Sequence, residues 1–584
     1  MNTVLIYPPP WKINPDGRLP EHPEDGPPPG LNHARCLQGD ILNIPSGLLS
    51  LAAQARRAGH TAAVLNLFSF AWNDIEKIIR HLHADLYGLS CFTSNRRGTL
   101  MLAGLIRRIH PGAHIAVGGP HATALPREII EHCAAVDTAV IGEGEETFAE
   151  LCRRIARGKG STGLAGAAWR EGTRIKTGPA RPRIENLDAL ASPFDYYNEY
   201  ILTTSRGCPW DCSFCASSVV WGREHRCHSP AAVLAMLEQI VNRNGQKAVA
   251  IKDETFTLDR ERVLSICNGI LERNLNFLWS CDTRADALDE ELLSIMRRAG
   301  CQRISLGVES AVPDILKAMQ KKIAPETVCA ASVMAKRVGM QVRFYLIVGA
   351  RGETPATLRE TIEFVKRAGP SQAIYNPFTL LPGTREFALA EQAGRVARDT
   401  FFTGNFFELN PLLMETESED ARALISWTIQ NSGLQYIHTQ NSAGAEAVVK
   451  RFPELHAAHL DLAGALYRRA DLDGAREHLQ RALELAYPLP GLCYNYLACI
   501  ATRRGDLEGA LAYLIKAKEH GFHQVVEENV AAAQSWITAG GPGQGIPLEL
   551  RADHSFEVTR PKMQPMTPGP ITIDGHEFNP VAFS

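Results

Sequence analysis

The chain has 584 residues, a formal net charge of −3 and an isoelectric point near 6.7. That length accommodates about three or four domains, and the near-neutral charge excludes a basic field of the kind that binds nucleic acid. The 14 cysteines are scattered apart from one cluster, which argues against a disulfide framework and predicts a reducing, cytoplasmic location. No run approaches the ~20 apolar residues that cross a bilayer, and Met1–Tyr7 has the pattern of a strand rather than of a signal peptide.

Residues 1–157 alternate short apolar runs with helical patterns, which predicts a doubly wound, Rossmann-like α/β domain. The expected strands are Val4–Tyr7, Ala62–Leu67, Leu86–Cys91, His114–Val117 and Ala135–Ile141, and the expected helices include Ser46–Ala58, Thr99–Ile109 and Thr147–Arg157. Ligands of such sheets bind at the carboxyl ends of the strands. Three of these strands are followed there by polar or glycine-containing loops, Ser90–Asn95, Gly118–His121 and Gly142–Glu145. Their glycines let the backbone approach a phosphate or a flat ring closely.

A proline-rich loop separates the first expected strand from the first expected helix. Residues 8–29 contain nine prolines, which remove backbone donors and fix φ, so the segment cannot form regular structure. Because it leaves a strand end beside the expected ligand site, we expect it to be functional rather than a disordered insertion.

A second α/β domain is expected at residues 196–400, after a linker at 158–195 that holds at most one small hairpin. Its expected strands are Tyr200–Ser205, Ala248–Lys252, Phe277–Asp282, Arg303–Val308, Gln341–Val348 and Gln372–Pro377. Helices between them, among them Pro230–Asn242, Arg260–Arg273 and Pro355–Arg367, indicate a partial (β/α)6 barrel of the TIM type, whose active site lies at the carboxyl ends of the strands. Charged and polar residues fall at or near those ends: Asp253, Glu254, Asp282, Arg284, Asp286, Glu309, Ser310 and, within the fifth strand, Arg343. For any one of them a solvated loop residue is the simpler interpretation, but four strand ends share the pattern.

Directly after the first barrel strand, Cys208, Cys212 and Cys215 follow a C-x3-C-x2-C spacing. Three thiolates so close together favour zinc or an iron–sulfur cluster. Four protein thiolates normally hold a four-iron cluster, so three leave one iron open, as in a catalytic site. A zinc knuckle would need a fourth ligand, for which Cys227 and His225 are the nearby candidates, and three unrelated buried thiols are the remaining alternative.

The cysteine run, with the aromatic Phe214 before its third cysteine, resembles the radical S-adenosylmethionine (SAM) enzymes. The resemblance implies a [4Fe-4S] cluster whose open iron binds the amino and carboxylate groups of SAM and cleaves it to a 5′-deoxyadenosyl radical. It also implies that the acidic pair after the second strand receives the SAM ammonium, which suits a carboxylate. The implied SAM-binding residues are Phe214, Asp253, Glu254, Arg284, Glu309, Ser310 and Arg343.

Beside this motif, the glycine loops of residues 1–157 resemble the cobalamin-binding domain fused to many radical SAM enzymes. The implied cobalamin-binding residues are Ser90, Phe92, Thr93, Ser94, Asn95, Gly118, Gly119, Gly142 and Glu143. The Asp-x-His-x-x-Gly motif that offers a histidine to cobalt elsewhere is absent after the first strand. We therefore expect cobalt without a protein imidazole ligand and a side chain near Phe92–Arg96 facing it.

The C-terminal part is expected to be helical. Residues 401–450 predict a helical extension with aromatics at Phe401, Phe402, Phe406 and Phe407, which either pack in a core or contact substrate. The run Arg468–Ala475 recurs as Arg503–Ala510, an offset of 35 residues, and this repeat within 451–538 resembles tetratricopeptide (TPR) repeats. Such an all-α domain either binds a peptide or protein partner or packs on the barrel as a structural wing. Residues 539–584 form a Gly/Pro-rich tail expected to wrap the body as extended chain.

The combined resemblance, over roughly residues 1–400, implies a cobalamin-dependent radical SAM methyltransferase acting on an unactivated carbon or phosphorus centre. A non-methylating cyclase or ring-rearrangement enzyme of the same family and a cobalamin-binding sensor or scaffold are the alternatives. The implied cofactors are the cluster, SAM and cobalamin. The implied partners are a small-molecule or peptide substrate and an external flavodoxin- or ferredoxin-like electron donor. Nothing in the sequence identifies the substrate.

Overall fold

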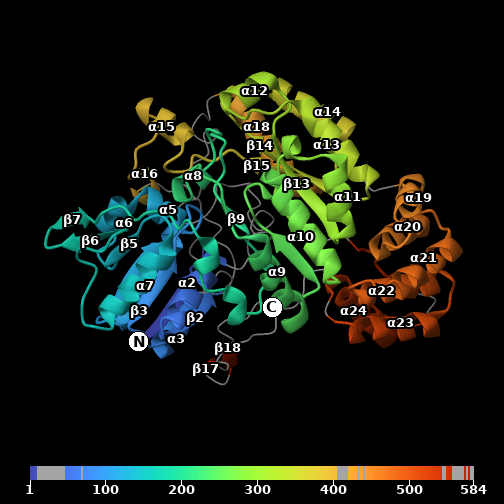
Figure 1. Ribbon diagram of the computed structural model, residues 1–584, viewed down its shortest axis with the longest axis horizontal. Helices are drawn as coiled ribbons and strands as arrows, with labels where there is room; N and C mark the ends of the chain where they lie inside the picture. Colours follow the sequence, from blue (N-terminus) through green and yellow to red (C-terminus); the bar gives the residue numbers. More distant parts are fainter. Residues whose placement is uncertain are drawn as a thin grey trace.

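The computed structural model describes residues 1–9, 46–67, 70, 72–403, 418–431, 433–437, 441–521, 523–541, 547–554, 571–573 and 576–578. Figure 1 shows three parts in chain order: an N-terminal α/β unit in blue and cyan, a central α/β unit in green and yellow, and a group of helices in orange and red. Most of the proline-rich loop, Phe406 and Phe407 lie outside the described residues. No helix in the described ranges combines the length and the apolar character needed to cross a membrane.

The N-terminal unit is built on a seven-stranded sheet of order β2-β1-β3-β4-β5-β6-β7, as far as the chain is described. The parallel strands are β1 (Asn2–Tyr7), β2 (Thr61–Asn66), β3 (Leu86–Ser90), β4 (His114–Gly118) and β5 (Thr138–Val140). The helices between them are α2 (Ser46–Arg57), α3 (Trp72–His81), α4 (Arg96–Ile109), α5 (Pro120–Ala124), α6 (Pro126–His132) and α7 (Gly144–Ile155). Apolar side chains cover both faces of this sheet, which is why its strands are continuous apolar runs. The five strands expected here and the doubly wound arrangement are confirmed.

Residues 158–195 connect the two α/β units and also add two strands to the first sheet. They contain β6 (Ala167–Glu171) and β7 (Arg174–Thr177), a hairpin that pairs antiparallel with β5 and extends the first sheet. Trp169, only 6% exposed, fixes the hairpin to the sheet. The short turns η1 (Leu187–Ala189) and η2 (Pro193–Asp195) then lead to the barrel.

The central unit is an open barrel of order β16-β15-β14-β13-β12-β11-β8. Its parallel strands are β8 (Ile201–Leu202), β11 (Ala248–Ile251), β12 (Leu278–Thr283), β13 (Cys301–Glu309), β14 (Gln341–Val348) and β15 (Gln372–Pro377). Its longer helices are α9 (Pro230–Glu238, continued by η3, Gln239–Arg243), α10 (Arg260–Glu272), α11 (Glu290–Arg298), α13 (Pro325–Arg337) and α14 (Pro355–Ala368). The six expected strands are confirmed, and the largest apolar core of the molecule lies between them and these helices.

Two details of the barrel differ from the expectation. The first strand ends at Leu202, and Ser205–Arg206 form a separate strand, β9, paired antiparallel with β10 (Arg226–Cys227). The second difference lies in residues 401–450. There, α18 (Glu419–Asn431) is followed by a strand, β16 (Gly433–Tyr436), which pairs antiparallel with β15 at the edge of the sheet. This segment is therefore not wholly helical.

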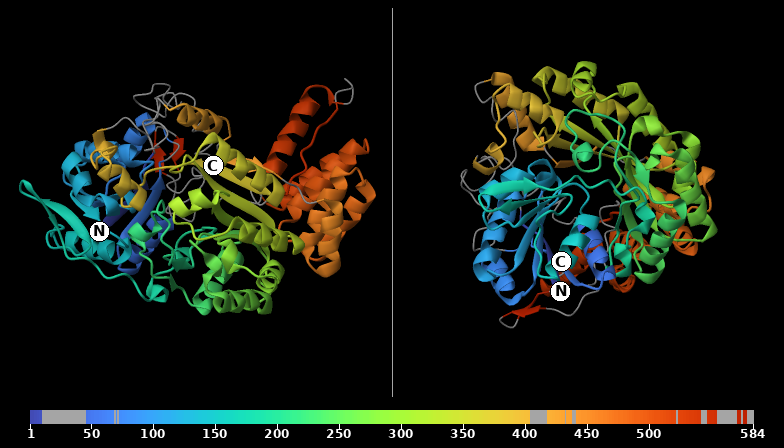
Figure 2. Two further views of the ribbon diagram at one scale, coloured as in Figure 1. Left: turned by 90° about the horizontal axis from the view of Figure 1, so that it is seen from above. Right: turned by 60° about the vertical axis from the view of Figure 1, so that its left-hand side comes forward.

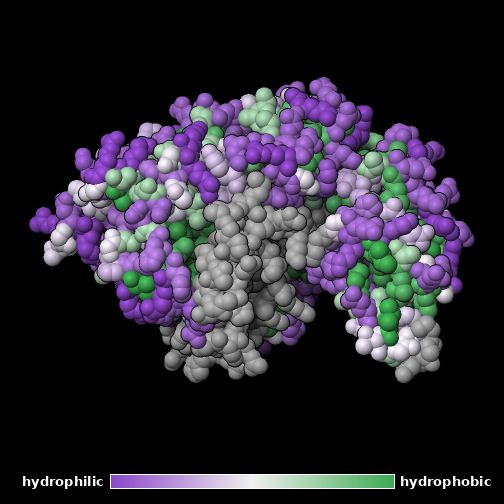
Figure 3. Space-filling view, turned by 90° about the horizontal axis from the view of Figure 1, so that it is seen from below, coloured by the Kyte–Doolittle hydropathy of each residue, from purple (hydrophilic) through white to green (hydrophobic). Residues whose placement is uncertain are grey.

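The C-terminal helices pack as successive antiparallel neighbours (Figures 1 and 2). They are α19 (Ser442–Arg451), α20 (His456–Arg468), α21 (Leu472–Glu484), α22 (Pro490–Arg503), α23 (Leu507–Glu519) and α24 (Gln524–Thr538). The two copies of the sequence repeat have the same local structure, because Asp471 and Asp506 cap α21 and α23 by accepting the amides of Gly474 and Gly509. Figure 3 shows apolar surface on this part. Ile515 of α23 and Ile537 of α24 are exposed apolar side chains. A terminal hairpin, β17 (Ile571–Ile573) and β18 (His576–Phe578), lies against α3 of the first unit.

Candidate functional site

The three cysteines of the C-x3-C-x2-C motif lie on a loop between β9 and the short helix α8 (Ser217–Val220), and all three are half-buried. The loop is anchored at Ser213, whose amide donates to the Met319 carbonyl at 2.9 Å and whose hydroxyl donates to Glu386 Oε1 at 2.6 Å. Burial raises the pKa of Cys215 to about 11 and also raises that of Cys212. Since a bound metal is what stabilises a thiolate in such a site, half-buried thiols on an anchored loop fit the cluster that the motif implies.

Gly207, directly before Cys208, can only be glycine. Its φ is 87°, and an added Cβ would lie 2.1 Å from the Glu224 carbonyl oxygen. The close approach of these two backbone segments turns the chain from β9 into the cysteine loop.

Asp253 holds the start of this loop. Its Oδ1 accepts the amides of Thr204 and Ser205 at 2.6 and 3.1 Å, and its Oδ2 accepts their hydroxyls at 2.5 and 2.8 Å. The carboxylate is 3% exposed and fully engaged by these bonds. These bonds explain why the first strand breaks before Ser205. The structure therefore gives Asp253 a partner other than the SAM ammonium expected from the resemblance.

Glu254 has the more open environment of the acidic pair. It is half-buried, and its Oε1 accepts the Ser217 hydroxyl of α8 at 3.1 Å. Burial raises its pKa, with a further contribution from the neighbouring Asp253 carboxylate. A carboxyl group that is costly to ionise gains most from a cation placed beside it.

Arg284, at the end of β12, packs on the cysteine loop. Its guanidinium lies 4.1 Å from the centre of the Trp210 ring and donates to both Asp286 oxygens at 2.9 and 2.7 Å. It also donates to the Lys322 carbonyl at 2.9 Å and is 4% exposed. Arg284 thus holds the cysteine loop in place through its contact with Trp210.

Glu309 ends β13 in a strained conformation. Its φ is 65°, unusual for a residue with a side chain, and the pairing of β13 with β14 shifts register between Gly307 and Glu309. The carboxylate pairs with Lys321 Nζ at 2.9 Å, and both side chains are buried. The Lys321 charge lowers the pKa of Cys212, against the larger effect of burial. This ion pair therefore lies beside the cysteine loop.

Ser310 and Arg343 are committed to internal partners. The Ser310 hydroxyl lies 3.2 Å from the Thr361 hydroxyl of α14 and accepts the Val312 amide at 3.2 Å. The Arg343 guanidinium donates to Gln372 Oε1 at 2.9 and 2.6 Å in the barrel interior. Phe214 packs with the apolar cluster of Val312, Phe378 and Leu380.

The candidates for a fourth metal ligand contact each other. Cys227 Sγ lies 3.5 Å from His225 Nδ1. Within the described ranges, no three His, Cys, Asp or Glu side chains converge closely enough to hold a single metal ion. A four-iron cluster does not require such convergence, because each thiolate binds its own iron.

The carboxyl ends of the first sheet combine an open rim with internally bonded side chains. Phe92 is 39% exposed, and Ser94, Gly118, Gly119 and Gly142 are half-buried. Gly119 has a φ of 105°, and an added Cβ would lie 2.8 Å from the Cys91 carbonyl oxygen. Such a backbone rim fits the flat ring and nucleotide tail of cobalamin.

Behind this rim, Ser90, Thr93 and Asn95 form a buried layer. Asn95 accepts the Phe92 amide at 2.7 Å and donates to the Ser90 carbonyl at 3.1 Å. The Thr93 hydroxyl lies 3.1 Å from His121 Nδ1. These side chains shape the rim, whereas Phe92, Ser94 and the glycines are the groups that a ligand can reach.

Glu143 joins the two α/β units. It accepts from Arg226 at 3.0 and 2.7 Å, from Arg206 at 3.4 Å and from the Ile184 amide at 2.6 Å. Arg206 also donates to Glu145 at 2.5 Å. Burial alone would raise the pKa of Glu143, but the Arg226 and Ile184 hydrogen bonds and the two arginine charges outweigh it and lower that pKa. Glu143 was expected at the cobalamin site, and its side chain is instead engaged by the cysteine-loop strand.

Arg206 and Arg226 were not predicted as functional residues. Arg206 ends β9 two residues before Cys208, and Glu143 directly follows Gly142 after β5, so this buried ion network joins the β9–β10 strand pair to the first unit. A charged residue beside a cysteine motif is the only sequence signal that could have indicated it.

Phe401 and Phe402 pack in the apolar contact between the first unit and α15 (Arg385–Gln392). Phe401 contacts the rings of His121 and Phe387, each with centroids 5.2 Å apart, and Phe402 stacks on His132 at 4.6 Å. Arg96 donates to the Phe401 carbonyl at 2.8 Å. Burial lowers the pKa of His121 to about 3, so this ring is neutral.

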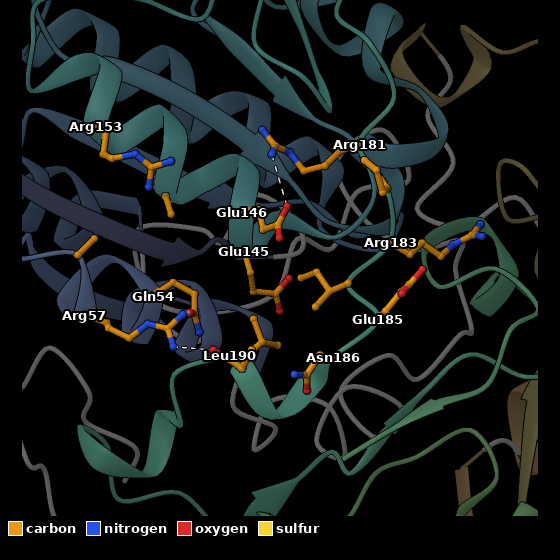
Figure 4. Close-up of a pocket in the computed structure, with 15 residues that line it drawn as sticks. Gln54, Arg57, Glu145, Glu146, Arg153, Arg181, Arg183, Glu185, Asn186 and Leu190 are labelled. Atoms are coloured by element: carbon orange, nitrogen blue, oxygen red, sulfur yellow. Dashed lines mark hydrogen bonds and ion pairs between the residues drawn. The ribbon is translucent and has the colours of Figure 1, made fainter. Parts of the chain in front are cut away.

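A cavity of about 840 Å³ lies on the other side of Glu145, between α2, α7 and residues 181–190 (Figure 4). Both signs of charge line it, and Arg181 reaches Glu146 across it at 3.5 Å. The cysteine loop does not contribute to its lining. This cavity is therefore distinct from the space at the strand ends.

Two families match this chain, one over each sheet. Residues 35–152 match the B12 binding domain and residues 202–365 match the radical SAM superfamily. The chain is 31% identical over 360 residues to an uncharacterized methyltransferase, PH0819, of Pyrococcus horikoshii, which covers 59% of this chain and 78% of that protein.

Further similarity is found to a cyclase and to a solved methyltransferase. The chain is 27% identical over 364 residues to the anaerobic magnesium-protoporphyrin IX monomethyl ester cyclase of Rubrivivax gelatinosus, covering 58% of this chain and 64% of the cyclase. Its fold is similar to that of the radical S-adenosylmethionine methyltransferase TsrM from Kitasatospora setae, solved with cobalamin and a [4Fe-4S] cluster bound. The TM-score is 0.56 at 17% identity, over 80% of this chain and 99% of TsrM.

The two sheets and the cysteine loop between them define a multi-cofactor α/β-barrel enzyme. The chain belongs to the radical SAM superfamily, with a B12 binding domain preceding its radical SAM domain. Its cofactors are a [4Fe-4S] cluster, SAM and cobalamin.

Proposed function

We propose that the protein is a methyltransferase that acts on an unactivated carbon or phosphorus centre. When bound, the cluster and SAM supply a 5′-deoxyadenosyl radical that takes hydrogen from the substrate, and cobalamin supplies the methyl group. The proposal rests mainly on the ion network of Glu143 and Arg206. Glu143 directly follows Gly142 of the rim, and Arg206 lies two residues before Cys208, so one buried contact links the rim to the cysteine loop. Radical chemistry followed by group transfer needs its two cofactors at such a fixed separation.

We assign the cluster to Cys208, Cys212 and Cys215 and the SAM ammonium to Glu254. Glu254 supports this assignment because it is half-buried beside α8 and holds a single described side-chain partner. Asp253, Arg284 and the Glu309–Lys321 pair are assigned as positioning residues that hold the walls of this space, with Phe214 packed behind the loop. Ser310 and Arg343 have internal partners that compete with any contact to SAM.

For cobalamin, we assign direct contact to Phe92, Ser94, Gly118, Gly119 and Gly142. Exposure of Phe92 supports its placement against the face of the ring. Ser90, Thr93 and Asn95 hold that rim from behind. The absence of a histidine on cobalt stays a prediction, since the loop concerned lies mostly outside the described residues.

A cyclase is the second candidate function. The similarity to the magnesium-protoporphyrin IX monomethyl ester cyclase favours it, but the match to the methyltransferase PH0819 has higher identity and covers more of its relative.

The remaining partners follow from the chemistry. Reductive cleavage of SAM needs an electron donor, for which a flavodoxin- or ferredoxin-like protein is suited. A cytoplasmic location fits the 13 described cysteines, all of which are free thiols. The paired helices α20–α23 support a TPR-like assignment for residues 451–538, through their repeated aspartate caps.

The proposal is tested by anaerobic reconstitution followed by turnover with SAM carrying a labelled methyl group. Cys208→Ala, Cys212→Ala and Cys215→Ala should each lose the [4Fe-4S] absorption and 5′-deoxyadenosine formation. Cys227→Ala is the matched control, because it lies on β10 outside the motif, and it should retain both. A motif variant that keeps its iron and its SAM cleavage would refute the cluster assignment. Transfer of label to a substrate supports methylation, whereas an unlabelled, ring-closed product supports the cyclase.

A further inference from the structure

The chain's own tail occupies a groove of the C-terminal helices. Residues 547–554 run as extended chain past α24, α22 and α20, with alternate side chains directed inward. Leu548 is 7% exposed and packs with Ala498, Leu514 and Trp536. Such alternation is the pattern of a bound strand, although no strand pairs with this segment among the described residues.

Two buried asparagines recognise the backbone of this segment. Asn495 and Asn529, 0% and 2% exposed, both donate to the Arg551 carbonyl, at 3.0 and 2.7 Å. Asn529 Oδ1 also accepts the Arg551 amide at 2.8 Å. Both main-chain groups of one residue are thereby held by side-chain amides. Asn529 Nδ2 also donates to Asn495 Oδ1 at 2.7 Å, so the two side chains form a fixed pair that presents donors and an acceptor to the main chain of an extended occupant.

The end of the segment connects the groove to the barrel. His554 lies 2.7 Å from the Tyr496 hydroxyl and 3.2 Å from Asp461. The other oxygen of Asp461 accepts from Arg297 of α11 at 2.6 Å, and the Arg297 side chain is fully buried. If another segment replaced residues 547–554, Asp461 would lose His554 as a partner. Asp461 also contacts Arg297 of α11, so the groove is linked to the barrel.

We propose that this groove is a docking site for an extended polypeptide, that residues 547–554 fill it as a resident ligand in cis, and that a partner segment with apolar residues at alternate positions exchanges with them. The recognition is suited to exchange because the asparagines bind main-chain atoms, which every peptide except one with proline at that position presents. The Arg551 side chain forms ion pairs with Glu528 at 3.1 Å and Asp553 at 2.6 Å, and both carboxylates are partly exposed. These exposed ion pairs contribute little to the choice of occupant. The proposal does not depend on the reaction chemistry of the barrel.

The test uses the full chain and a fluorescent peptide with the sequence of residues 547–554. Arg551→Pro in the chain removes the amide that donates to Asn529 and so weakens the resident ligand without changing the groove. Fluorescence anisotropy should show the peptide binding the Arg551→Pro chain at least tenfold more tightly than the wild-type chain, in which the tethered tail competes at a high effective concentration. A peptide that itself carries the Arg551→Pro change should bind at least tenfold more weakly than the unchanged peptide.

Groove variants separate this site from adventitious binding. In the Arg551→Pro chain, a further Asn495→Ala change should abolish peptide binding, whereas Gln534→Ala on the exposed face of α24 should leave it unchanged. Equal binding to the wild-type and Arg551→Pro chains, or binding that survives Asn495→Ala, would overturn the proposal. If light scattering showed a dimer that dissociates in excess peptide, the groove would be filled by the tail of a second copy of the chain. That result would overturn the cis arrangement.

If Arg551→Pro unfolds the C-terminal helices, protease sites inserted within residues 542–546 and within residues 555–570 of the wild-type chain give a second test. The second site is needed because the terminal hairpin also contacts α3. After both cleavages, excess unlabelled peptide should displace the segment of residues 547–554, which mass analysis should then find in the released fraction. A segment that stays bound at every peptide concentration would contradict exchange.

Discussion

The barrel contacts its two neighbours at opposite ends and through different chemistry. At the carboxyl ends of its strands, β9 meets the B12 binding domain through the buried charges of Arg206 and Glu143. At the amino ends, Ala248 and Leu278 open β11 and β12 and pack in one apolar cluster with Val448 and Leu455 of the C-terminal part. In TIM-type barrels the carboxyl end carries catalysis and the amino end carries stability. The first contact thus lies at the end of the barrel that is expected to carry catalysis, and the second holds the C-terminal part at the opposite end.

The strongest test of this contrast is Asp253→Ala, in the carboxyl-end half. Alanine removes both carboxylate oxygens, so the buried amides and hydroxyls of Thr204 and Ser205 lose this acceptor, at a cost of about 3 kcal/mol. We expect loss of iron from the reconstituted protein, measured by iron content and visible absorption. Glu254→Ala is the matched control and should keep its iron while binding SAM at least tenfold more weakly, by equilibrium dialysis. Full iron in Asp253→Ala would show that the Asp253 carboxylate does not hold the cysteine loop.

The next largest effect is expected from Glu143→Gln in the ion network. Removing one charge leaves Arg226 and Arg206 buried with a weaker partner, a cost of about 3–5 kcal/mol. We expect both cofactors to bind but methyl transfer to fall more than SAM cleavage, because the separation of the two sites is no longer held. A double-mutant cycle with Arg226→Met checks the pair, and additive effects on stability would contradict direct coupling.

At the amino-end contact, Asp461→Asn should affect stability and leave chemistry intact. Arg297 is fully buried and keeps only the Cys301 carbonyl, at 3.2 Å, as a described partner besides Asp461. We expect unfolding of the C-terminal helices at lower urea concentration, with SAM cleavage in the absence of substrate unchanged. Loss of that cleavage would remove the distinction between the two ends.

The smallest effect concerns Glu199, two residues before β8 at the same amino end. Burial raises its pKa from 4.5 to about 8. Between these values the folded protein holds a proton that the unfolded chain has released, so the free energy of unfolding falls as pH rises, by up to about 1.4 kcal/mol per pH unit. Glu199→Gln should remove this slope in urea titrations at pH 5.5 and pH 7.5. Identical pH dependence in both proteins would mean that Glu199 is ionised when folded.

The sequence predicted the strands of both sheets well because each is a short apolar run separated from the next by a helix-length segment. It did not predict the hydrogen-bond and ion-pair partners of the site residues. Asp253 looked available for a ligand, since its spacing from Thr204 and Ser205, 49 and 48 residues, has no local signature. Glu143 was placed at the right strand end, but its arginine partners lie 63 and 83 residues away.

Short segments at sheet edges were also hard to predict. Gly433–Tyr436 continues a helical pattern in the sequence, and it becomes β16 because β15 offers an unpaired edge. The hairpin of β6 and β7 likewise joins the first sheet through pairing with β5. Whether such segments become strands depends on the edge available to them rather than on their own composition.

The tail is fixed at both of its described ends, at the groove by residues 547–554 and at α3 by β17. The 16 residues between them, 555–570, reach at most about 60 Å when fully extended. The chain therefore forms a closed circuit from the B12 binding domain through the barrel and the C-terminal helices and back again. The length of these 16 residues limits how far the first unit can move relative to the C-terminal helices. A larger displacement would require that the groove release its segment or that the terminal hairpin leave α3.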